Sequence, residues 1–316
     1  MRFISHAILT ALVFTWALTA QAAPKVVATI SPLHSLTAGV MVGVGTPKLL
    51  LPPGASPHGY ALKPSDARAL AEADIVVWVG EGLEQFLTKP LATLAAKARQ
   101  VELAEAPGLT ALKFRAGDAW ASHDEDTHES DRGHEAAHHH DHTGVDPHIW
   151  LDPQNAQRMV EAIAAALIHA DPENAERYEI NAETLRSRLA ALDHDLATKL
   201  QAVATRPFIV FHDSYQYLER RYRLTSLGTV TASPQFQPGA RRISELRKRL
   251  ESANGACLFT EPQFSPALAR TLAHETGAHL ATLDPLGADI EPGPNAYFIM
   301  MTRLGDHLHD CLAALP

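Results

Sequence analysis

The sequence predicts an α/β protein of two lobes, each with a mostly parallel sheet flanked by helices, joined by one long linker helix. Short apolar, β-branched runs alternate with alanine-rich helical stretches in both halves, as expected of βα units with buried parallel strands. Between the halves lies a long segment without glycine or proline that carries a helical apolar stripe. The 316 residues, 46% hydrophobic and 20% charged, suffice for two cores and exclude disorder of the whole chain.

The first 22 residues have the pattern of a secretory signal. Arg2 is the only charged residue before Lys25, an apolar run covers residues 7–18, and Ala20-Gln21-Ala22 has the small-x-small form of a cleavage site. The alternative is a membrane anchor, but the run is shorter than the roughly 20 residues that span a bilayer. We therefore expect an exported protein cleaved near Ala22.

The two lobes are expected over residues 23–170 and 205–316. The strand-like runs are residues 26–30, 49–51 and 75–79 in the first lobe and residues 208–211, 257–260 and 279–283 in the second. The helical patterns are residues 65–73 in the first lobe and residues 241–252 and 266–275 in the second. Pro64 and Ser65 supply the start signals of the first of these helices.

The linker helix is expected over residues 171–204. Asp171 is a suitable N-cap and Pro172 suits the first helical position. Apolar residues then recur every three or four positions: Tyr178, Ala182, Leu185, Leu189, Leu192, Leu196, Leu200 and Val203. A coiled-coil dimer is the competing interpretation, but the stripe is only about four heptads long. We expect a monomer with a stiff strut between its lobes.

Charge and cysteine content narrow the class of protein further. The net charge of −9 argues against nucleic acid as a partner. Cys257 and Cys311 are the only cysteines, and an even pair in an oxidising compartment tends to form a disulfide. We predict a Cys257–Cys311 bridge, with two buried free thiols as the alternative.

Residues 123–142 read HDEDTHESDRGHEAAHHHDH, which has no apolar periodicity and predicts a flexible loop. Its histidines are His123, His128, His134, His138, His139, His140 and His142. Clustered imidazoles suit Zn, Cu and Ni, so the loop is expected to contact metal, with a solvated polar loop as the alternative. A flexible site loses chain entropy on closing and should bind more weakly than a site on rigid elements.

Four residues occupy positions that suit a rigid site. In open α/β sheets, ligands bind beyond the carboxyl ends of the strands. His58 follows the strand-like run 49–51, and His148 lies in Asp146-Pro-His148, just after the flexible loop. His212 and Asp284 directly follow strand-like runs of the second lobe. Each lobe thus supplies two candidates, as a site in a cleft between lobes requires.

Enzyme motifs are missing, and the protein is not expected to be an enzyme. His274-Glu275 is followed by His279 at i+5, whereas a zinc protease needs His-Glu-x-x-His on one helix face. Ser214 beside His212 has no glycine-flanked serine elbow. The remaining histidines, namely His34, His169, His194, His307 and His309, fall in helical stretches as surface or packing residues.

Six motifs together resemble the metal-binding proteins of bacterial ABC importers, specifically the ZnuA-type zinc-uptake branch. They are Pro53-Gly-Ala-Ser-Pro-His58, Pro64-Ser-Asp66, Asp146-Pro-His148-Ile-Trp-Leu-Asp152, Phe211-His212-Asp213-Ser-Tyr215, Thr260-Glu-Pro-Gln263 and Leu283-Asp-Pro-Leu-Gly287, and they span nearly all of the mature chain. The resemblance implies a periplasmic protein that captures Zn²⁺ as its transported ligand and delivers it to an inner-membrane permease with its ATPase. It also implies a helix-bridged pair of lobes and an auxiliary metal-collecting loop.

The resemblance further implies that His58, His148 and His212 are the metal ligands and that Cys257 pairs with Cys311. Related manganese and iron proteins carry a glutamate at the position of His212, and three nitrogens favour zinc over manganese. Pro57 replaces a glutamate found before the first ligand in some zinc members, so the fourth ligand is expected to be Asp284 or water, with Glu81 as a weaker candidate. The alternatives are a Mn²⁺ or Ni²⁺ transport protein, an exported zinc hydrolase, or a storage or adhesion protein.

Overall fold

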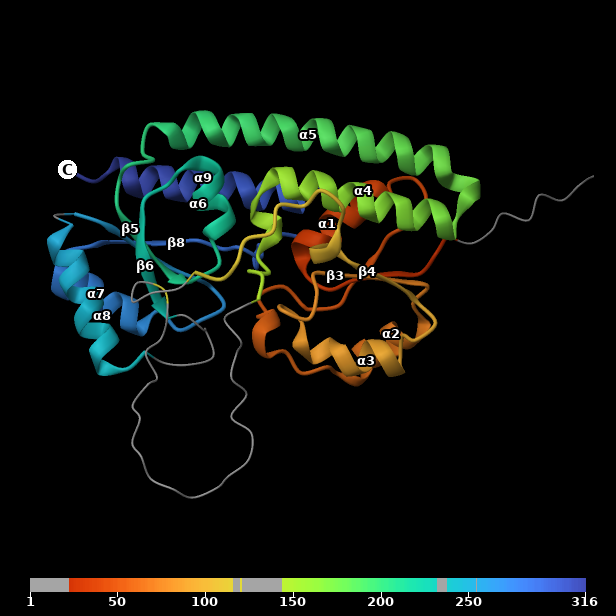
Figure 1. Cartoon of the computed structure of the whole chain (residues 1–316), viewed down its shortest axis with the longest axis horizontal. Coiled ribbons are helices and arrows are strands. Elements are labelled where there is room, and N and C mark those ends of the chain that lie inside the picture. Colours follow the sequence, from red (N-terminus) through yellow and green to blue (C-terminus); the bar gives the residue numbers. More distant parts are fainter. Residues whose placement is uncertain (1–22, 116–119, 121–143, 232–237, 254) are drawn as a thin grey trace, which may run out of the picture.

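The computed structural model describes residues 23–115, 120, 144–231, 238–253 and 255–316. The expected signal segment and the histidines of residues 123–142 therefore lie outside the described residues. Two four-stranded parallel sheets lie side by side (Figure 1). Within the described ranges, no helix is long and apolar enough to cross a membrane.

The first sheet has the strand order β2-β1-β3-β4. Its strands are β1 (Val26–Ala28), β2 (Lys48–Leu49), β3 (Ile75–Trp78) and β4 (Arg99–Glu102). Both β1 and β3 are fully buried, which is why they are continuous apolar runs. Strand β4 is largely exposed and has no continuous apolar run, so it was not predicted.

The second sheet repeats this plan with the order β6-β5-β7-β8. Its strands are β5 (Phe208–His212), β6 (Ser226–Thr231), β7 (Cys257–Thr260) and β8 (His279–Thr282). All of its pairings are parallel. Two parallel sheets flanked by helices confirm the predicted fold class, although β6 is an addition to the predicted strands.

Helices cover both faces of each sheet (Figure 1). The first sheet lies between α2 (Pro64–Glu72) with α3 (Thr88–Thr93) and the pair α1 (Ser31–Val40) and α4 (Pro153–Ala170). The second lies between α7 (Ala240–Ser252) with α8 (Ala267–Thr276) and the pair α6 (Gln216–Tyr222) and α9 (Ala296–Ala313).

The predicted long helix is α5 (Ala175–Gln201), which follows a 3₁₀ turn at Pro172–Asn174 and runs above both sheets (Figure 1). Asp171 does not cap a backbone N–H. Its carboxylate instead accepts from Asn174 Nδ2 and Tyr178 Oη, at 2.8 Å each. The predicted apolar stripe of α5 is buried from Tyr178 to Leu200. One hydrophobic core runs through this helix into both lobes, so the lobes are not independent bodies.

The cysteines form the predicted disulfide, which links β7 to α9. The alternative of two free thiols is therefore wrong. The bridge closes a loop of 54 residues between the second sheet and the last helix. Closing a loop of this size stabilises the folded state by roughly 4 kcal/mol in the chain-entropy model.

Two glycines allow neighbouring helices to pack closely against α5. A Cβ atom on Gly305 of α9 would lie 2.4 Å from Leu196 Cδ2, and one on Gly39 of α1 would lie 2.6 Å from Leu185 Cδ1. Both leucines are almost fully buried and have little space to retreat into. The close helix contacts around α5 therefore depend on the missing side chains at these two positions.

We predict that Gly305→Ala destabilises the protein by about 1–3 kcal/mol through overpacking, despite the higher helix propensity of alanine. Leu196→Ala should be destabilising alone but should remove most of the penalty of Gly305→Ala in the double variant. Chemical denaturation of the four proteins measures this coupling. Strictly additive effects would contradict the proposed contact.

Glu84 is a buried carboxylate at the carboxyl ends of β1 and β3. It accepts hydrogen bonds from Thr29 Oγ1 at 2.5 Å and from the backbone N–H groups of Val79 and Gly80 at 3.0–3.2 Å. Burial is the largest influence and raises the pKa of Glu84 to about 7, although these hydrogen bonds oppose the shift. The unfolded chain releases this proton at lower pH than the folded protein does.

Folding stability should therefore fall as pH rises from the unfolded pKa of Glu84, about 4.3, towards its folded pKa near 7. Glu84→Gln removes this dependence, and Thr29 can reverse its hydrogen bond to accept from the amide. We expect the variant to gain stability relative to wild type, on the order of 3 kcal/mol, between pH 4.5 and pH 8. Parallel stability curves for the two proteins in denaturant titrations across this range would refute the assignment.

Candidate metal centre

His58 lies in a 3₁₀ turn at Pro57–Gly59, in the loop that follows β2. Gly54 turns the chain before it with a φ of +82°, a conformation that side chains disfavour. Ser56 Oγ then accepts a hydrogen bond from the His58 N–H at 3.4 Å. The glycine and the serine together bring a partly buried imidazole from the first lobe to the interlobe face.

His148 comes from the other end of the first lobe, directly before a 3₁₀ turn at Ile149–Leu151. It is buried, and Asp146 Oδ1 accepts hydrogen bonds from both its backbone N–H at 3.0 Å and its ring Nδ1 at 2.7 Å. The same carboxylate therefore fixes the backbone and the ring orientation of this residue.

His212 is the last residue of β5 rather than the first residue after it. Its strand lies between β6 and β7, where the order of the second sheet reverses. This reversal is the point at which open parallel sheets bind ligands. Glu261, directly after the neighbouring strand β7, accepts a hydrogen bond from His212 Nδ1 at 2.7 Å.

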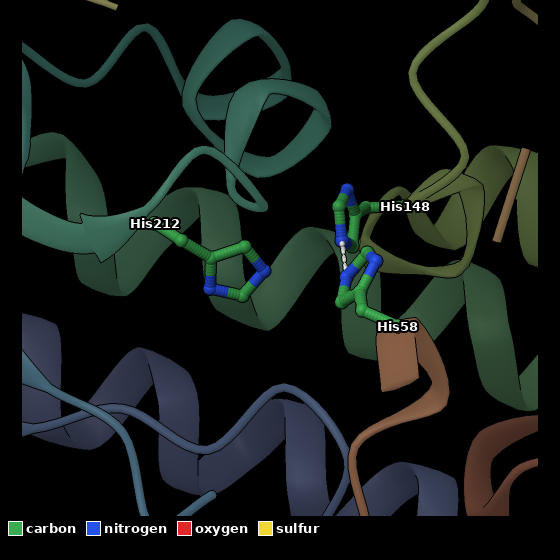
Figure 2. Close-up of side chains that lie close together, drawn as sticks. All are labelled: His58, His148 and His212. Carbon is green, nitrogen blue, oxygen red and sulfur yellow. Dashed lines mark hydrogen bonds between the residues drawn. The ribbon is translucent and has the colours of Figure 1, made fainter. Parts of the chain in front are cut away.

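The three imidazoles converge on one point between the lobes (Figure 2). One nitrogen from each ring lies within 4.8 Å of the others, and the Nε2 atoms of His58 and His148 are 3.3 Å apart. Nitrogens bound to one tetrahedral Zn²⁺ at about 2.0–2.1 Å are separated by about 3.3 Å. The observed spacing therefore suits a shared metal ion after only small side-chain movements.

The two carboxylates determine which ring nitrogens are available to a metal. Because His148 and His212 donate Nδ1–H to Asp146 and Glu261, their Nε2 atoms carry the lone pairs and face the centre. His212 Nε2 is buried and has no hydrogen-bond partner. Burial lowers the pKa of His148 well below its usual value. For His212, burial acts in the same direction, but Glu261 outweighs it and raises the pKa.

Apolar and aromatic groups line most of the space around the imidazoles. Trp150 packs beside His148 with ring centroids 5.4 Å apart, and Phe264 packs beside His212 at 5.6 Å. Trp150 Nε1 also donates to Pro285 O at 2.8 Å, so this wall spans both lobes. A mostly apolar lining lowers the local dielectric constant and so strengthens the polar interactions inside the centre.

A second polar cluster holds the lobes together beside the centre. Tyr217 of the second lobe accepts from Leu112 N at 3.0 Å and donates to Asp146 O at 2.8 Å. Arg115 forms ion pairs with Asp213, which follows His212, and with the buried Glu219. These bonds connect the backbone around Asp146 to the first turn after His212.

The centre contains three of the four predicted ligands, and Asp284 is not among them. The Asp284 carboxylate accepts four hydrogen bonds, from Gln263 Nε2 and from the backbone N–H groups of residues 286, 287 and 288. Glu81, the weaker candidate, is exposed and also lies outside the group. The five other described histidines that were expected to be surface or packing residues lie in α1, α4, α5 and α9.

Asp146 and Glu261 were not predicted as site residues from the sequence. Both are in the motifs quoted above, and each had a detectable signal. Asp146 precedes His148 by two residues, and Glu261 directly follows a predicted strand, as His212 does. Ligating histidines usually donate their second nitrogen to such an acceptor, so carboxylates in these positions are candidates for that role.

Comparisons with known proteins point to one family. Residues 26–311 match the family model described as "ZnuA: Zinc-uptake complex component A periplasmic". The chain is 41% identical over 305 residues to the high-affinity zinc uptake system protein ZnuA of Brucella suis, covering 91% of each chain, and 36% identical over 302 residues to that of Yersinia pestis, covering 92% of each. A crystal structure of a zinc-bound ZnuA deletion mutant has a TM-score of 0.76 at 27% identity and covers 93% of this chain and 100% of that one.

We predict that Asp146→Asn and Glu261→Gln each lower zinc affinity by about 10–100-fold, because the histidine beside each loses a charged acceptor. Glu275→Gln, at an exposed ion pair with Arg247, is the matched control and should leave affinity unchanged. Competition with a chromophoric chelator measures the difference. Wild-type affinity in both carboxylate variants would show that these hydrogen bonds do not tune the ligands.

Proposed function

Because the chain belongs to the ZnuA family of zinc-uptake components, we propose that it captures Zn²⁺ in the periplasm and delivers it to an inner-membrane ABC importer. The ligands are His58, His148 and His212, and the ion is cargo rather than a resident cofactor. The convergence of three imidazole nitrogens within 4.8 Å of one another is the observation that carries this proposal. The proposed partners are the permease of the importer and its ATPase.

The donor set favours zinc among the metals that such proteins transport. Three neutral nitrogens in a small, mostly apolar space suit a tetrahedral Zn²⁺ with one further ligand. Mn²⁺ prefers more oxygen ligands and a larger coordination number. Ni²⁺ accepts imidazole, so the direct comparison of Zn²⁺ with Ni²⁺ is the informative one.

The shared core constrains how the importer can recognise the loaded protein. Since α5 and its neighbours form one hydrophobic core with both lobes, a wide hinge closure would have to expose apolar surface. We propose that the importer instead senses a local rearrangement of the loops that carry His58 and His148.

The seven histidines of residues 123–142 are proposed to collect zinc for the centre. The chain enters and leaves this segment beside the proposed ligands. Lys113 pairs with Val145 in an antiparallel bridge, and Asp146 N donates to Leu112 O at 2.8 Å. Asp146 and His148 follow this stem, so the segment joins the described part of the chain directly before two residues of the centre.

We expect alanine substitution of His58, His148 or His212 to lower zinc affinity by more than the roughly 100-fold expected for an outer partner. His194→Ala, at an exposed position on α5, is the matched control. The substitutions are best made both in the full chain and in a variant lacking residues 121–143, so that weak sites do not mask the tight one.

Competitive titrations with Zn²⁺, Ni²⁺ and Mn²⁺ would measure these affinities. One tight zinc site that survives deletion of residues 121–143 and disappears with each ligand substitution is the expected result. Unchanged zinc affinity in His58→Ala and His212→Ala would refute the cleft site. A preference for Ni²⁺ over Zn²⁺ larger than that of a simple imidazole ligand would refute the assignment of the cargo.

A further inference from the structure

The side chain of Gln263 lines the same space as the three imidazoles and has no role in the proposed ligand set. Gln263 lies in the loop after β7, two residues beyond Glu261. Its Nε2 donates to Asp284 Oδ1 at 2.8 Å, and its Oε1 is buried without a hydrogen-bond partner. A buried acceptor without a donor is unfavourable, so its position beside a metal centre indicates a donor that binds there.

Asp284 fixes which end of this amide is the acceptor for the centre. An ionised carboxylate only accepts hydrogen bonds, so Nε2 must face Asp284 and Oε1 must be the free end. Asp284 is itself held by three backbone N–H groups, those of Leu286, Gly287 and Ala288. The amide of Gln263 is thus oriented by a rigid turn, with its oxygen left for a donor.

Two other polar side chains line this space, those of Ser56 and Glu261. Ser56 Oγ accepts from the backbone N–H of His58. Glu261 Oε1 accepts from His212 Nδ1, at the edge of that ring away from the metal-facing Nε2, and its Oε2 is a buried anionic oxygen without a hydrogen-bond partner. Most remaining lining groups are apolar or aromatic, as described above. Gln263 Oε1 is therefore the uncharged acceptor of this lining that has no donor.

We propose that Gln263 Oε1 accepts a hydrogen bond from the water molecule that completes the zinc shell. This inference rests on the proposed zinc site. Three histidines leave one tetrahedral position, which water commonly fills in open sites. Metal-bound water is a strong donor, so an oriented amide oxygen stabilises it without adding a negative charge. Gln263 is then a positioning residue for the fourth ligand, and Asp284 acts through Gln263 instead of binding the ion.

The proposal predicts that Gln263→Leu, which keeps the approximate shape but removes the acceptor, lowers zinc affinity about tenfold. Gln263→Met provides a second apolar replacement if leucine disturbs packing. Gln154→Leu, at an exposed glutamine at the start of α4, is the matched control. The same variants should be loaded with Co²⁺, whose visible absorption reports the ligands of a four-coordinate shell.

Azide binding to the Co²⁺ protein separates this role from a general structural one. Azide has no proton to donate, so replacing water with azide loses the hydrogen bond to Gln263 in the wild type only. We expect Gln263→Leu and Gln263→Met to bind azide about tenfold more tightly than wild type and Gln154→Leu, as judged from the shift of the visible bands.

Two results would overturn the proposal, and neither would affect the zinc site itself. One is a zinc affinity within twofold of wild type in both Gln263 variants. The other is a lowered zinc affinity with unchanged azide affinity, which indicates only a packing role. Failure of the proposed function has a different signature, because the wild-type protein would then show no tight zinc site and His212→Ala would change nothing.

Discussion

The centre depends on the two buried hydrogen bonds that His148 and His212 donate to Asp146 and Glu261. A histidine without such an acceptor can rotate and can present either nitrogen, whereas these rings are held with Nε2 towards the centre. Each carboxylate is placed by the backbone next to its sheet or turn, so the directions of the ligands follow from the fold. A preorganised set of donors does not have to be ordered by the ion, which favours tight binding.

The helical layer around α5 supplies the second constraint, the distance between the lobes. Ligands from two lobes can form one site only if the lobes keep a fixed relative position. One hydrophobic core that runs through α5 holds them in this position. Gly39 and Gly305 let α1 and α9 approach α5 closely enough for that core to be continuous. The hydrogen bonds from Trp150 to Pro285 and from Tyr217 to Asp146 fix the same relative position of the lobes beside the imidazoles. A change of conformation at the centre is then most simply achieved by moving loops, because a wide hinge motion of the lobes would expose this core.

The three imidazoles leave the fourth coordination position of a tetrahedral ion without a protein ligand among the predicted residues. Pro57 has no side-chain donor, and Asp284 accepts four hydrogen bonds, three from its own turn and one from Gln263. In the proposed shell, the three imidazoles and the water are all neutral ligands. Negative charge near the ion then comes from the outer carboxylates Asp146 and Glu261.

The sequence by itself determined the fold class, the long helix and the three imidazoles, because each has a local pattern. Most of the buried parallel strands are continuous apolar runs, α5 has a helical stripe, His212 ends such a strand, and His58 follows the apolar run at residues 49–51. The largely exposed strand β4 lacks that pattern, and the mostly buried β6 (Ser-Leu-Gly-Thr-Val-Thr) has glycine and threonines in place of a continuous apolar run, so both were missed. Only the tertiary structure decided the hydrogen bonds of Asp284 and Gln263. Both lie in predicted motifs next to the site, but the direction of a carboxylate depends on which N–H groups surround it. The turn at residues 284–288 and Gln263 Nε2 donate to Asp284, and Gln263 Oε1 is left buried without a partner.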